Sequence, residues 1–269
     1  MCIFANCNLN GYMLQVADNN MLRRRRYFLH LAYNGAKYCG WQIQPNAPSV
    51  QETLEKGIST VLRERVEVVG CGRTDAGVHA SDFYAHFDAV GAVDVEQLRF
   101  KLNSFLPTDI VIYGVFGVRD EAHARFDAVS RTYQYHVCNG RQPFRGGLYG
   151  RIFFDPDVEA MNRAAEALLE YEDFTSFSKL HTQTKTNNCR LLEAHWDVVD
   201  GEYVFTIRSN RFLRNMVRSI TGTLLDVGRG KLDVAGLRGI VEQRNRCAAG
   251  VSMPAEGLFL TRVEYPEGW

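Results

Sequence analysis

The sequence is short of the features that mark membrane, secreted and zinc-binding proteins. Its longest apolar runs have the length of strands, well below the roughly 18 consecutive apolar residues that a membrane-spanning helix needs. Its seven cysteines form no C-x-x-C pair and no Cys/His group at zinc-ligand spacing, which argues against a disulfide framework and a metal site. Residues 1–20 lack Lys and Arg and contain five Asn, which argues against a secretory signal. We expect a cytoplasmic protein with reduced thiols, no metal and no membrane association.

The sequence also lacks an excess of charge of either sign. It has 31 basic and 31 acidic residues, whereas proteins that bind nucleic acid usually carry a basic surplus. A neutral chain can still bind RNA if its arginines gather on one face. The distribution of arginines therefore decides the question, and the total does not.

The hydrophobic pattern predicts one structural plan that is used twice in 269 residues. The first half reads as strand, helix, two strands, helix and strand, at residues 27–33, 49–62, 66–69, 83–87, 94–106 and 110–118. This order is the split β-α-β-β-α-β arrangement. Ser49 with Glu52 forms a capping box, and Asp94 caps the second helix.

The second half repeats this plan with longer connections. Its expected elements are a strand at 132–137, a helix at 158–168, a hairpin at 191–199 and 203–207, helices at 211–227 and 234–242, and a strand at 258–263. Adjacent hairpin strands predict mostly antiparallel sheets, hence an α+β fold of two similar domains rather than a doubly wound one. We place the domains at 27–128 and 129–269, after a disordered extension at 1–26.

The glycine-rich segment at residues 71–79, Cys-Gly-Arg-Thr-Asp-Ala-Gly-Val-His, is the first candidate site. Glycines on both sides of Thr74 and Asp75 are expected to bring these two residues to an exposed tip. A carboxylate placed there beside Arg73 and partly removed from water is a competent nucleophile. The alternative is an ordinary turn, in which Asp75 bonds its own backbone and Thr74 caps it. A phosphate-binding loop is disfavoured because no G-K-[ST] follows.

Residues 130–135 alternate like a strand and place Arg131, Tyr133 and Tyr135 on one face. Either both tyrosines pack on a sheet, or Tyr133 offers a ring on which a base stacks, with its hydroxyl close by. We expect one of the two tyrosines to be structural.

Three arginines, Arg211, Arg214 and Arg218, follow at i, i+3 and i+7 and are expected on one face of the helix at 211–227, which Asn210 would cap. Such a row is commonly a solvated face. It also suits phosphates, or a carboxylate from another segment.

Together these segments resemble the bacterial tRNA pseudouridine synthase A family. The matching segments are Tyr33-Asn34-Gly35 with Tyr38, Gly40-Trp41-Gln42, Ser49-Val50-Gln51-Glu52, residues 72–80, Phe87, Ala122-His123-Ala124-Arg125-Phe126, Tyr133, Asp173-Phe174-Thr175-Ser176-Phe177, and Phe212-Leu213 with Met216-Val217-Arg218. Two steps depart from the family pattern: Ser81-Asp82-Phe83 stands where Gly-Gln is common, and Arg131-Thr132 where two basic residues are common.

The resemblance implies a function and a set of roles. The family isomerises uridines at tRNA positions 38, 39 and 40 with two α+β domains around a cleft, works as a homodimer with one tRNA across both subunits, and needs neither metal nor organic cofactor. By this resemblance Asp75 is the catalytic aspartate, acting on C6 or C1′; Arg73 expels the target nucleotide from its stack. Tyr133 stacks on the uracil and its hydroxyl is a candidate acceptor of the C5 proton, and Arg218 orients Asp75. We further expect Thr74 at the substrate, and the arginines Arg131, Arg211 and Arg214 against RNA.

Two other classes remain open at this point. A catalytically silent RNA-binding module would tolerate the loss of Asp75. A different enzyme could use an Arg–Asp pair on a small molecule and would need no tRNA-sized surface.

Overall fold

The computed structural model describes residues 23–179 and 186–267. Most of the predicted extension at 1–26 lies outside these residues, but Arg24, Arg25 and Arg26 belong to the first strand. The domain boundaries given above, including the division near residue 128, stay a prediction.

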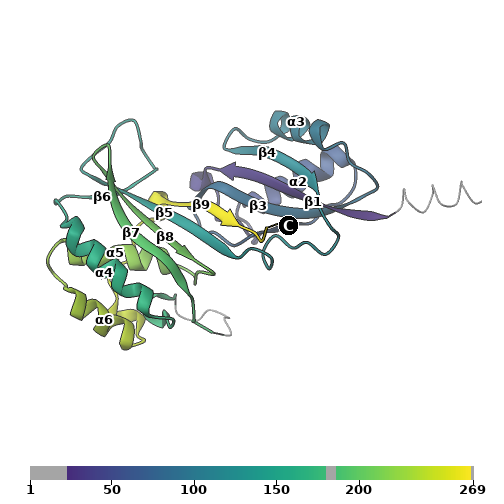
Figure 1. The fold of residues 1–269 in the computed structure, drawn as a ribbon. Helices are drawn as coiled ribbons and strands as arrows, with labels where there is room; N and C mark the ends of the chain where they lie inside the picture. Colours follow the sequence, from purple (N-terminus) through teal and green to yellow (C-terminus); the bar gives the residue numbers. More distant parts are fainter. Residues whose placement is uncertain (1–22, 180–185, 268–269) are drawn as a thin grey trace, which may run out of the picture.

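The strands form one twisted sheet that runs through both halves of the molecule (Figure 1). The strands are β1 (Arg24–Tyr33), β2 (Val68–Gly70), β3 (His79–Val90), β4 (Ile110–Gly117), β5 (Ser130–Asn139), β6 (Gly150–Ile152), β7 (Leu191–Val199), β8 (Glu202–Ser209) and β9 (Leu258–Glu264). The described helices are α2 (Val50–Leu62), α3 (Val95–Phe105), α4 (Val158–Ala167), α5 (Met216–Gly228) and α6 (Val234–Glu242). The α+β class is confirmed.

The two halves repeat the same strand order. The first half has the order β4-β1-β3-β2 and the second has β9-β5-β8-β7. Neighbouring strands are antiparallel except in the pairs β3–β9 and β5–β6. The repeated plan and the mostly antiparallel pairing thus follow the sequence pattern.

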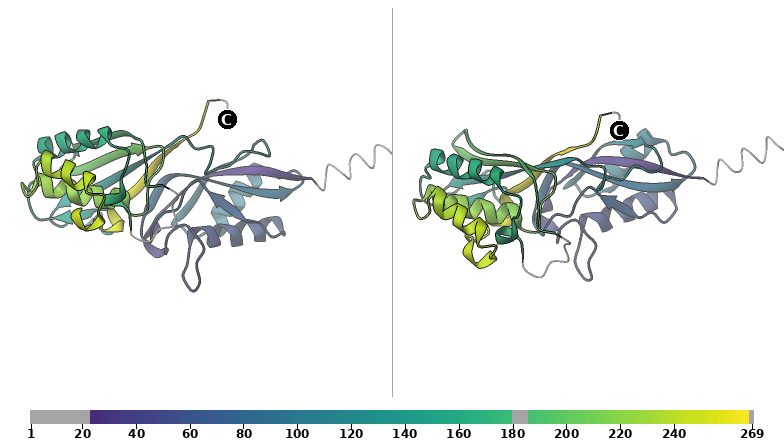
Figure 2. Two further views of the ribbon diagram at one scale, coloured as in Figure 1. Left: turned by 90° about the horizontal axis from the view of Figure 1, so that it is seen from below. Right: turned by 60° about the horizontal axis from the view of Figure 1, so that its bottom comes forward.

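The halves do not keep separate sheets, contrary to the expectation of one sheet in each. Strand β9 lies between β3 and β5, and it joins β3 through the pairs His79↔Phe259 and Ala80↔Leu260. Asp82 is one of the residues at which this sequence departs from the family pattern, and it strengthens the junction. Its carboxylate accepts a hydrogen bond from the backbone N–H of Val263 at 2.7 Å. A strand added from one half to the sheet edge of the other makes a continuous layer, which Figure 2 shows from two sides.

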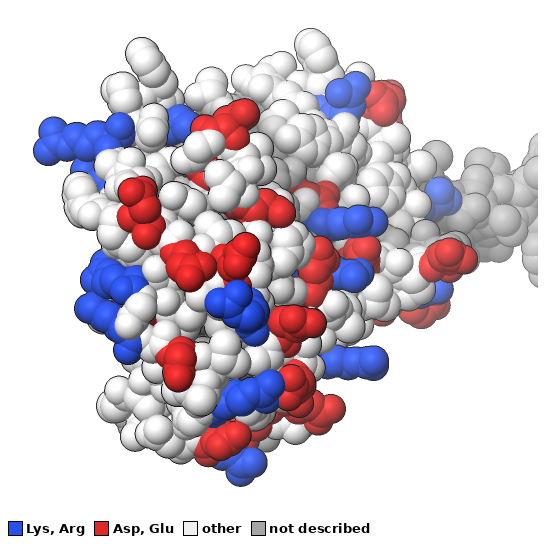
Figure 3. All heavy atoms as spheres, turned by 60° about the vertical axis from the view of Figure 1, so that its left-hand side comes forward, with Lys and Arg blue, Asp and Glu red and all other residues white. Residues whose placement is uncertain are grey.

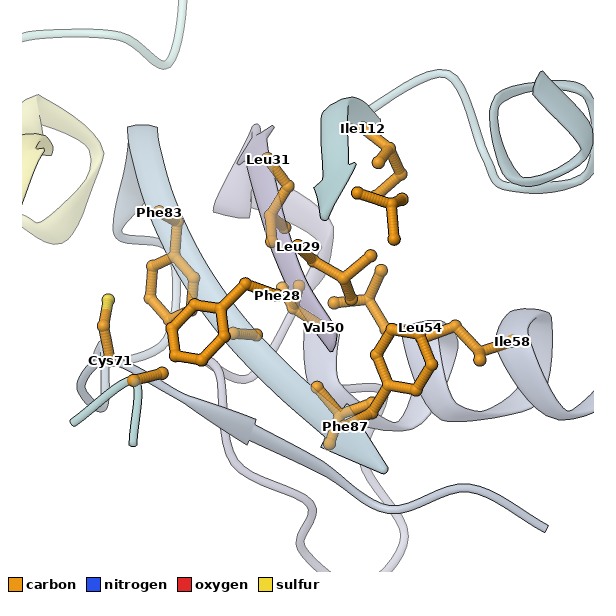
Figure 4. Close-up of a cluster of buried hydrophobic side chains, with 14 of the residues drawn as sticks. Phe28, Leu29, Leu31, Val50, Leu54, Ile58, Cys71, Phe83, Phe87 and Ile112 are labelled. Atoms are coloured by element: carbon orange, nitrogen blue, oxygen red, sulfur yellow. The ribbon is translucent and has the colours of Figure 1, made fainter. Parts of the chain in front are cut away.

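Each half has its own hydrophobic core. In the first, side chains of β1 such as Leu29 and Leu31 lie on the side of the sheet that carries Leu54 and Ile58 of α2 (Figure 4). In the second, α4 packs against β7 and α5 against β5, while α6 packs against α4. A fully buried side chain of this size contributes about 1.5–3 kcal/mol. Each half is therefore stabilised by a core of its own.

The helix that was predicted at 211–227 begins five residues later, at Met216. Asn215 has a left-handed backbone (φ 67°), which interrupts helical geometry before that point. Asn210 does not cap the helix; its side-chain oxygen accepts the N–H of Arg190 at 2.8 Å. The prediction that Arg211, Arg214 and Arg218 share one helical face is therefore wrong. Only Arg218 is helical.

None of the described helices has the length and apolar character needed to cross a membrane. Within residues 23–179 and 186–267, no three His, Cys, Asp or Glu side chains are grouped so that they could hold a metal ion.

Candidate active site

The loop at residues 71–78 lies where the two halves meet. It connects the end of β2 to the start of β3, where β9 pairs with His79. Cys71 at one end is buried in the first core, and Val78 at the other end is buried in the second. The ring of His79 stacks on that of Phe259 with 4.6 Å between centroids. Both halves therefore fix the position of this loop.

Residues 33–41 support the loop through contacts with Thr74. The hydroxyls of Tyr33 and Thr74 are hydrogen-bonded at 2.9 Å, and the carbonyl of Thr74 accepts the N–H of Trp41 at 3.3 Å. Gly40 has a left-handed backbone (φ 94°), and a Cβ there would stand 2.4 Å from the carbonyl oxygen of Thr74. Only glycine permits this approach. Two of the matching sequence segments are thus explained as supports of the loop.

Thr74 is not at an exposed tip, contrary to expectation. Its side chain is buried against Tyr33. Of the two glycines, Gly77 alone is needed for the turn: it has φ 78°, and the N–H of Val78 donates to the carbonyl of Asp75 at 3.1 Å. Gly72 has open space around the position of a Cβ. Thr74 is therefore placed to support the loop rather than to meet solvent.

The carboxylate of Asp75 faces two arginines that come from the second half. Nη1 of Arg218 lies 3.8 Å from Oδ2, and Nε of Arg214 lies 3.4 Å from Oδ1. Among the described residues, the side chain of Asp75 forms these two ion pairs and no hydrogen bond to its own turn, so the alternative of an ordinary turn is not observed. The structure thus brings Asp75 together with two of the three arginines that the sequence singled out.

Arg218 is held rigidly at the start of α5. Its Nε donates to the carbonyl of Met253 at 2.6 Å, and its own carbonyl accepts the N–H of Met253 at 3.0 Å. A cation in the first turn faces the positive end of the helix dipole, which is unfavourable for the helix itself. The first turn of α5 contains no acidic residue, and Asp75 supplies the missing negative charge from the other half.

Tyr133 reaches the loop through the register of the sheet. Ala80 of β3 pairs with Leu260 of β9, which pairs with Tyr133 of β5. The ring of Tyr133 meets Phe212 edge to face, with 5.1 Å between centroids. Burial raises the pKa of Tyr133 well above that of a free phenol, and the nearby carboxylate of Asp75 raises it further. The hydroxyl is therefore neutral at physiological pH.

Tyr135 on the same strand is the structural member of the pair. It is fully buried, and its hydroxyl donates to the carbonyl of Pro254 at 2.7 Å. One of the two tyrosines therefore serves packing, as the sequence indicated.

Arg131 joins three backbone segments through four carbonyl groups. Its guanidinium donates to the carbonyls of Cys71, Arg125, Ala128 and Asn210 at 2.9, 2.7, 3.0 and 3.0 Å. These bonds join the start of the Asp75 loop to the loops at 119–128 and 210–215. Arg131 thus has a positioning role, and a contact with RNA stays a prediction for it.

Arg125 is a candidate that the sequence analysis did not select. Its pKa is lowered, first by burial and then by the positive charges of Arg73, Arg131 and Arg211. We call Arg73, Arg125, Arg131 and Arg211 the arginine cluster. Among the described residues, no acidic side chain pairs with Arg73, Arg125 or Arg211. The segment Ala122–Phe126, which matches the family, was the available signal.

The loop that carries Arg125 is preorganised. Nδ1 of His123 accepts the N–H groups of Arg125 and Phe126 at 3.1 and 3.2 Å, and the ring of His123 packs on Phe126 at 4.2 Å. The side chain of Phe126 is nevertheless 75% exposed. A rigid loop that presents an aromatic ring beside unpaired guanidinium groups is suited to RNA, which offers phosphates and flat bases.

Figure 3 shows one face of the molecule, on which Lys and Arg are interspersed with Asp and Glu. That mixture is in keeping with a net charge of zero. The arginine cluster differs from this mixture because its positive charges lie close enough together to lower the pKa of Arg125.

Comparison with known proteins identifies the family. A family model described as tRNA pseudouridine synthase matches residues 164–266. The tRNA pseudouridine synthase A of Bacteroides thetaiotaomicron is 56% identical over 246 residues, which cover 90% of this chain and 91% of the relative. The proteins of the same name from Porphyromonas gingivalis and Colwellia psychrerythraea are 54% and 37% identical, with 90% and 91% of this chain and 97% and 95% of the relatives covered.

The chain therefore belongs to the tRNA pseudouridine synthase family, and within that family it is similar over nearly its whole length to proteins named tRNA pseudouridine synthase A. As a member it is an isomerase that acts on tRNA.

Proposed function

We propose that this protein converts uridine to pseudouridine at positions 38, 39 and 40 of the tRNA anticodon stem-loop, with Asp75 as the catalytic nucleophile. The observation that carries the proposal is the placement of Asp75. Its loop is anchored in both cores, and its carboxylate faces Arg214 and Arg218 from the opposite half. A carboxylate held in this way is preorganised for attack.

The reaction explains why such a site needs no external reagent. The N1–C1′ bond of the nucleotide breaks, uracil rotates, and C5 bonds to C1′. Every heavy atom stays in the substrate, and the proton lost from C5 is balanced by the proton that N1 takes up from solvent. Asp75 attacks either C6 of uracil or C1′ of ribose, and its placement is compatible with both.

A uridine inside a stacked stem is out of reach and must be flipped out, which costs a few kcal/mol. Arg73 supports this step because it is exposed beside Asp75 and has no ion-pair partner within the described part of the chain. Stacking of the base on Tyr133 contributes about 1–3 kcal/mol. Together these two residues would offset the cost of flipping.

Tyr133 has a second proposed role at C5. Its raised pKa keeps the hydroxyl protonated at rest. To accept the C5 proton the hydroxyl must pass its own proton on in the same step, and the proposed acceptor is the nearby Asp75 carboxylate once its bond to the nucleotide has broken. The ring and the hydroxyl therefore carry separable functions.

The arginine cluster supports a polyanionic substrate. Arg73, Arg125 and Arg211 lack acidic partners among the described residues, which suits successive phosphates of an RNA strand. We further propose that the enzyme is a cytoplasmic homodimer with one tRNA across both subunits, as the family resemblance implies. Sedimentation as a monomer at micromolar concentration would contradict the dimer.

The two other classes are less well supported. A catalytically silent RNA-binding module would not need a carboxylate that is positioned by two cores and two arginines. An enzyme for a small molecule has no use for unpaired arginines spread over the loops at 73, 125 and 211. Both features are explained together by a reaction on RNA.

The proposal is tested in cells that lack this protein and are complemented with the wild type or with Asp75→Asn. We expect the wild type to restore pseudouridine at positions 38–40 and the variant to restore none, because an amide is no nucleophile. Purified Asp75→Asn should still bind tRNA, since it keeps the arginine cluster. Pseudouridine at these positions in the variant strain would refute the role of Asp75, and restoration at other positions would refute the assigned sites.

A further inference from the structure

The two arginines that contact Asp75 are held in very different ways. The Arg218 side chain is 21% exposed and is anchored on the carbonyl of Met253. The Arg214 side chain is 59% exposed and lies in the turn before α5. Within residues 23–179 and 186–267, the guanidinium of Arg214 has no partner besides Asp75. Arg218 is therefore held in place by a second contact, whereas Arg214 can move away from Asp75.

Together the two arginines cover both oxygens of the carboxylate. Arg218 lies against Oδ2 and Arg214 against Oδ1. A nucleophilic oxygen must present a lone pair to the reacting carbon, at about 3–3.5 Å before bond formation. A guanidinium nitrogen at 3.4 Å from Oδ1 occupies that kind of position. The two arginines therefore narrow the approach of a reacting carbon to the carboxylate, and the one without an anchor, which can widen that approach by moving, is Arg214.

A phosphate is the group that can take Arg214 away from Asp75. An ion pair this exposed contributes little, because solvent screens it and both side chains lose freedom. Arginine binds phosphate in charge-assisted, often bidentate, hydrogen bonds. Arg214 also lies beside the loop of Arg211, a member of the arginine cluster, so a strand bound there passes close to it.

We propose that Arg214 is an exchangeable counterion of Asp75: it covers Oδ1 in the free enzyme and moves to a backbone phosphate of the bound tRNA. Oδ1 is then uncovered only when the substrate is in place, while Arg218 continues to orient Oδ2. Arg214 is a positioning residue in this scheme. The inference rests on the proposed function and adds a coupling between RNA binding and the state of the nucleophile.

The exchange has a measurable consequence for binding. If Arg214 must give up Asp75 to reach the phosphate, neutralising Asp75 removes a competitor. Asp75→Asn should then bind tRNA about two- to fivefold more tightly than the wild type, which is the range that an exposed ion pair allows. The gain should vanish when Arg214 is absent.

The test is a double-mutant cycle on binding, which does not depend on catalysis. Wild type, Asp75→Asn, Arg214→Gln and the double variant are titrated into a tRNA transcript without uridine at positions 38–40, so that no turnover occurs. Fluorescence anisotropy is followed at several salt concentrations. We expect the tightening by Asp75→Asn in the wild-type background and not in the Arg214→Gln background.

Salt dependence gives a second readout. Loss of one phosphate contact should lower the slope of log K against log salt by about 0.7–0.9 for Arg214→Gln, whereas Arg214→Lys should keep the slope. As a matched control, the tightening by Asp75→Asn should persist in an Arg218→Gln background, because Arg218 is anchored to Met253.

Equal tightening by Asp75→Asn with and without Arg214 would overturn the inference, since it would show simple repulsion between Asp75 and RNA. An unchanged salt slope in Arg214→Gln would overturn it as well. Failure of the proposed function looks different: Asp75→Asn would then keep its activity, whatever the binding cycle shows.

Discussion

At the scale of single residues, the site depends on a charge balance that no one segment contains. Asp75 is supplied by the first half, and Arg214 and Arg218 are supplied by the second. Arg218 needs an acidic partner because it occupies the positive end of α5. The carboxylate and the arginine thus stabilise each other's placement, and their separation in sequence is bridged by the sheet.

Some of these residues could be identified from the sequence, and others could not. Arg73, Asp75 and Arg218 were singled out from the sequence through the family resemblance, and the structure places Arg218 next to Asp75. Thr74 was misplaced because its burial depends on Tyr33, 41 positions away, and no local pattern encodes that contact. Arg125 was overlooked because its significance comes from the positive charges around it in space.

Tyr133 offers a prediction that separates its ring from its hydroxyl. Tyr133→Phe keeps the stacking ring, so tRNA affinity should stay near that of the wild type. Turnover should fall by about 100-fold or more, as expected for the loss of a general base. Tyr133→Leu removes the ring too and should weaken binding by about 1–3 kcal/mol. Pseudouridine formation in single-turnover reactions, with binding by anisotropy, distinguishes the two effects.

The assignment of the hydroxyl fails if Tyr133→Phe turns over at the wild-type rate. In that case the ring alone is used, and another group takes the C5 proton.

At the scale of elements, the loops were harder to predict than the helices and strands. Helix α6 and the hairpin of β7 and β8 follow their hydrophobic patterns, and Ser49 and Asp94 cap their helices as expected. The predicted start of α5 was wrong because the left-handed backbone of Asn215 interrupts the helix there, although the hydrophobic periodicity of the sequence continues through this residue. Hydrophobic periodicity reports burial, and it does not report the backbone angle that ends a helix.

The loop at 119–127 is attached to β3 through His86, and this attachment should be sensitive to pH. Nδ1 of the buried His86 accepts the N–H of Ala124 at 3.1 Å. Burial, with the positive charges of Arg26 and His123, lowers the pKa of His86 to about 4. The folded protein therefore binds this proton less tightly than the unfolded chain does. The protein therefore has its full stability, as far as His86 is concerned, above about pH 6.5, and its free energy of unfolding falls as the pH drops towards 4.

From this shift we expect His86 to remove about 2 kcal/mol from the free energy of unfolding between pH 7.5 and pH 5. His86→Asn keeps an acceptor for Ala124 but no titrating group, so it should lose correspondingly less over the same range. Urea unfolding at the two pH values measures the difference. Identical pH dependence of the two proteins would show that His86 takes up its proton normally in the folded state.

At the scale of the whole molecule, the repeated plan could be predicted from the sequence, but the joining of the two halves into one sheet could not. Both halves were visible as β-α-β-β-α-β patterns, since periodicity and turns are local signals. The insertion of β9 between β3 and β5 depends on a pairing between residues about 180 positions apart, such as Ala80 and Leu260. That pairing positions the active site, because the Asp75 loop enters β3 at the same point.

The neutral net charge makes the arginine cluster the natural source of RNA affinity, and this leads to the last prediction. Each of Arg73→Gln, Arg125→Gln and Arg211→Gln should weaken tRNA binding and lower the slope of log K against log salt by about 0.7–0.9, one phosphate contact each. Arg163→Gln is the control, since Arg163 is exposed on α4 and paired with Glu159. It makes the same change in net charge and should leave the slope unaltered. If all four variants behave alike, the protein attracts RNA through its overall charge, and the cluster is not a specific phosphate site.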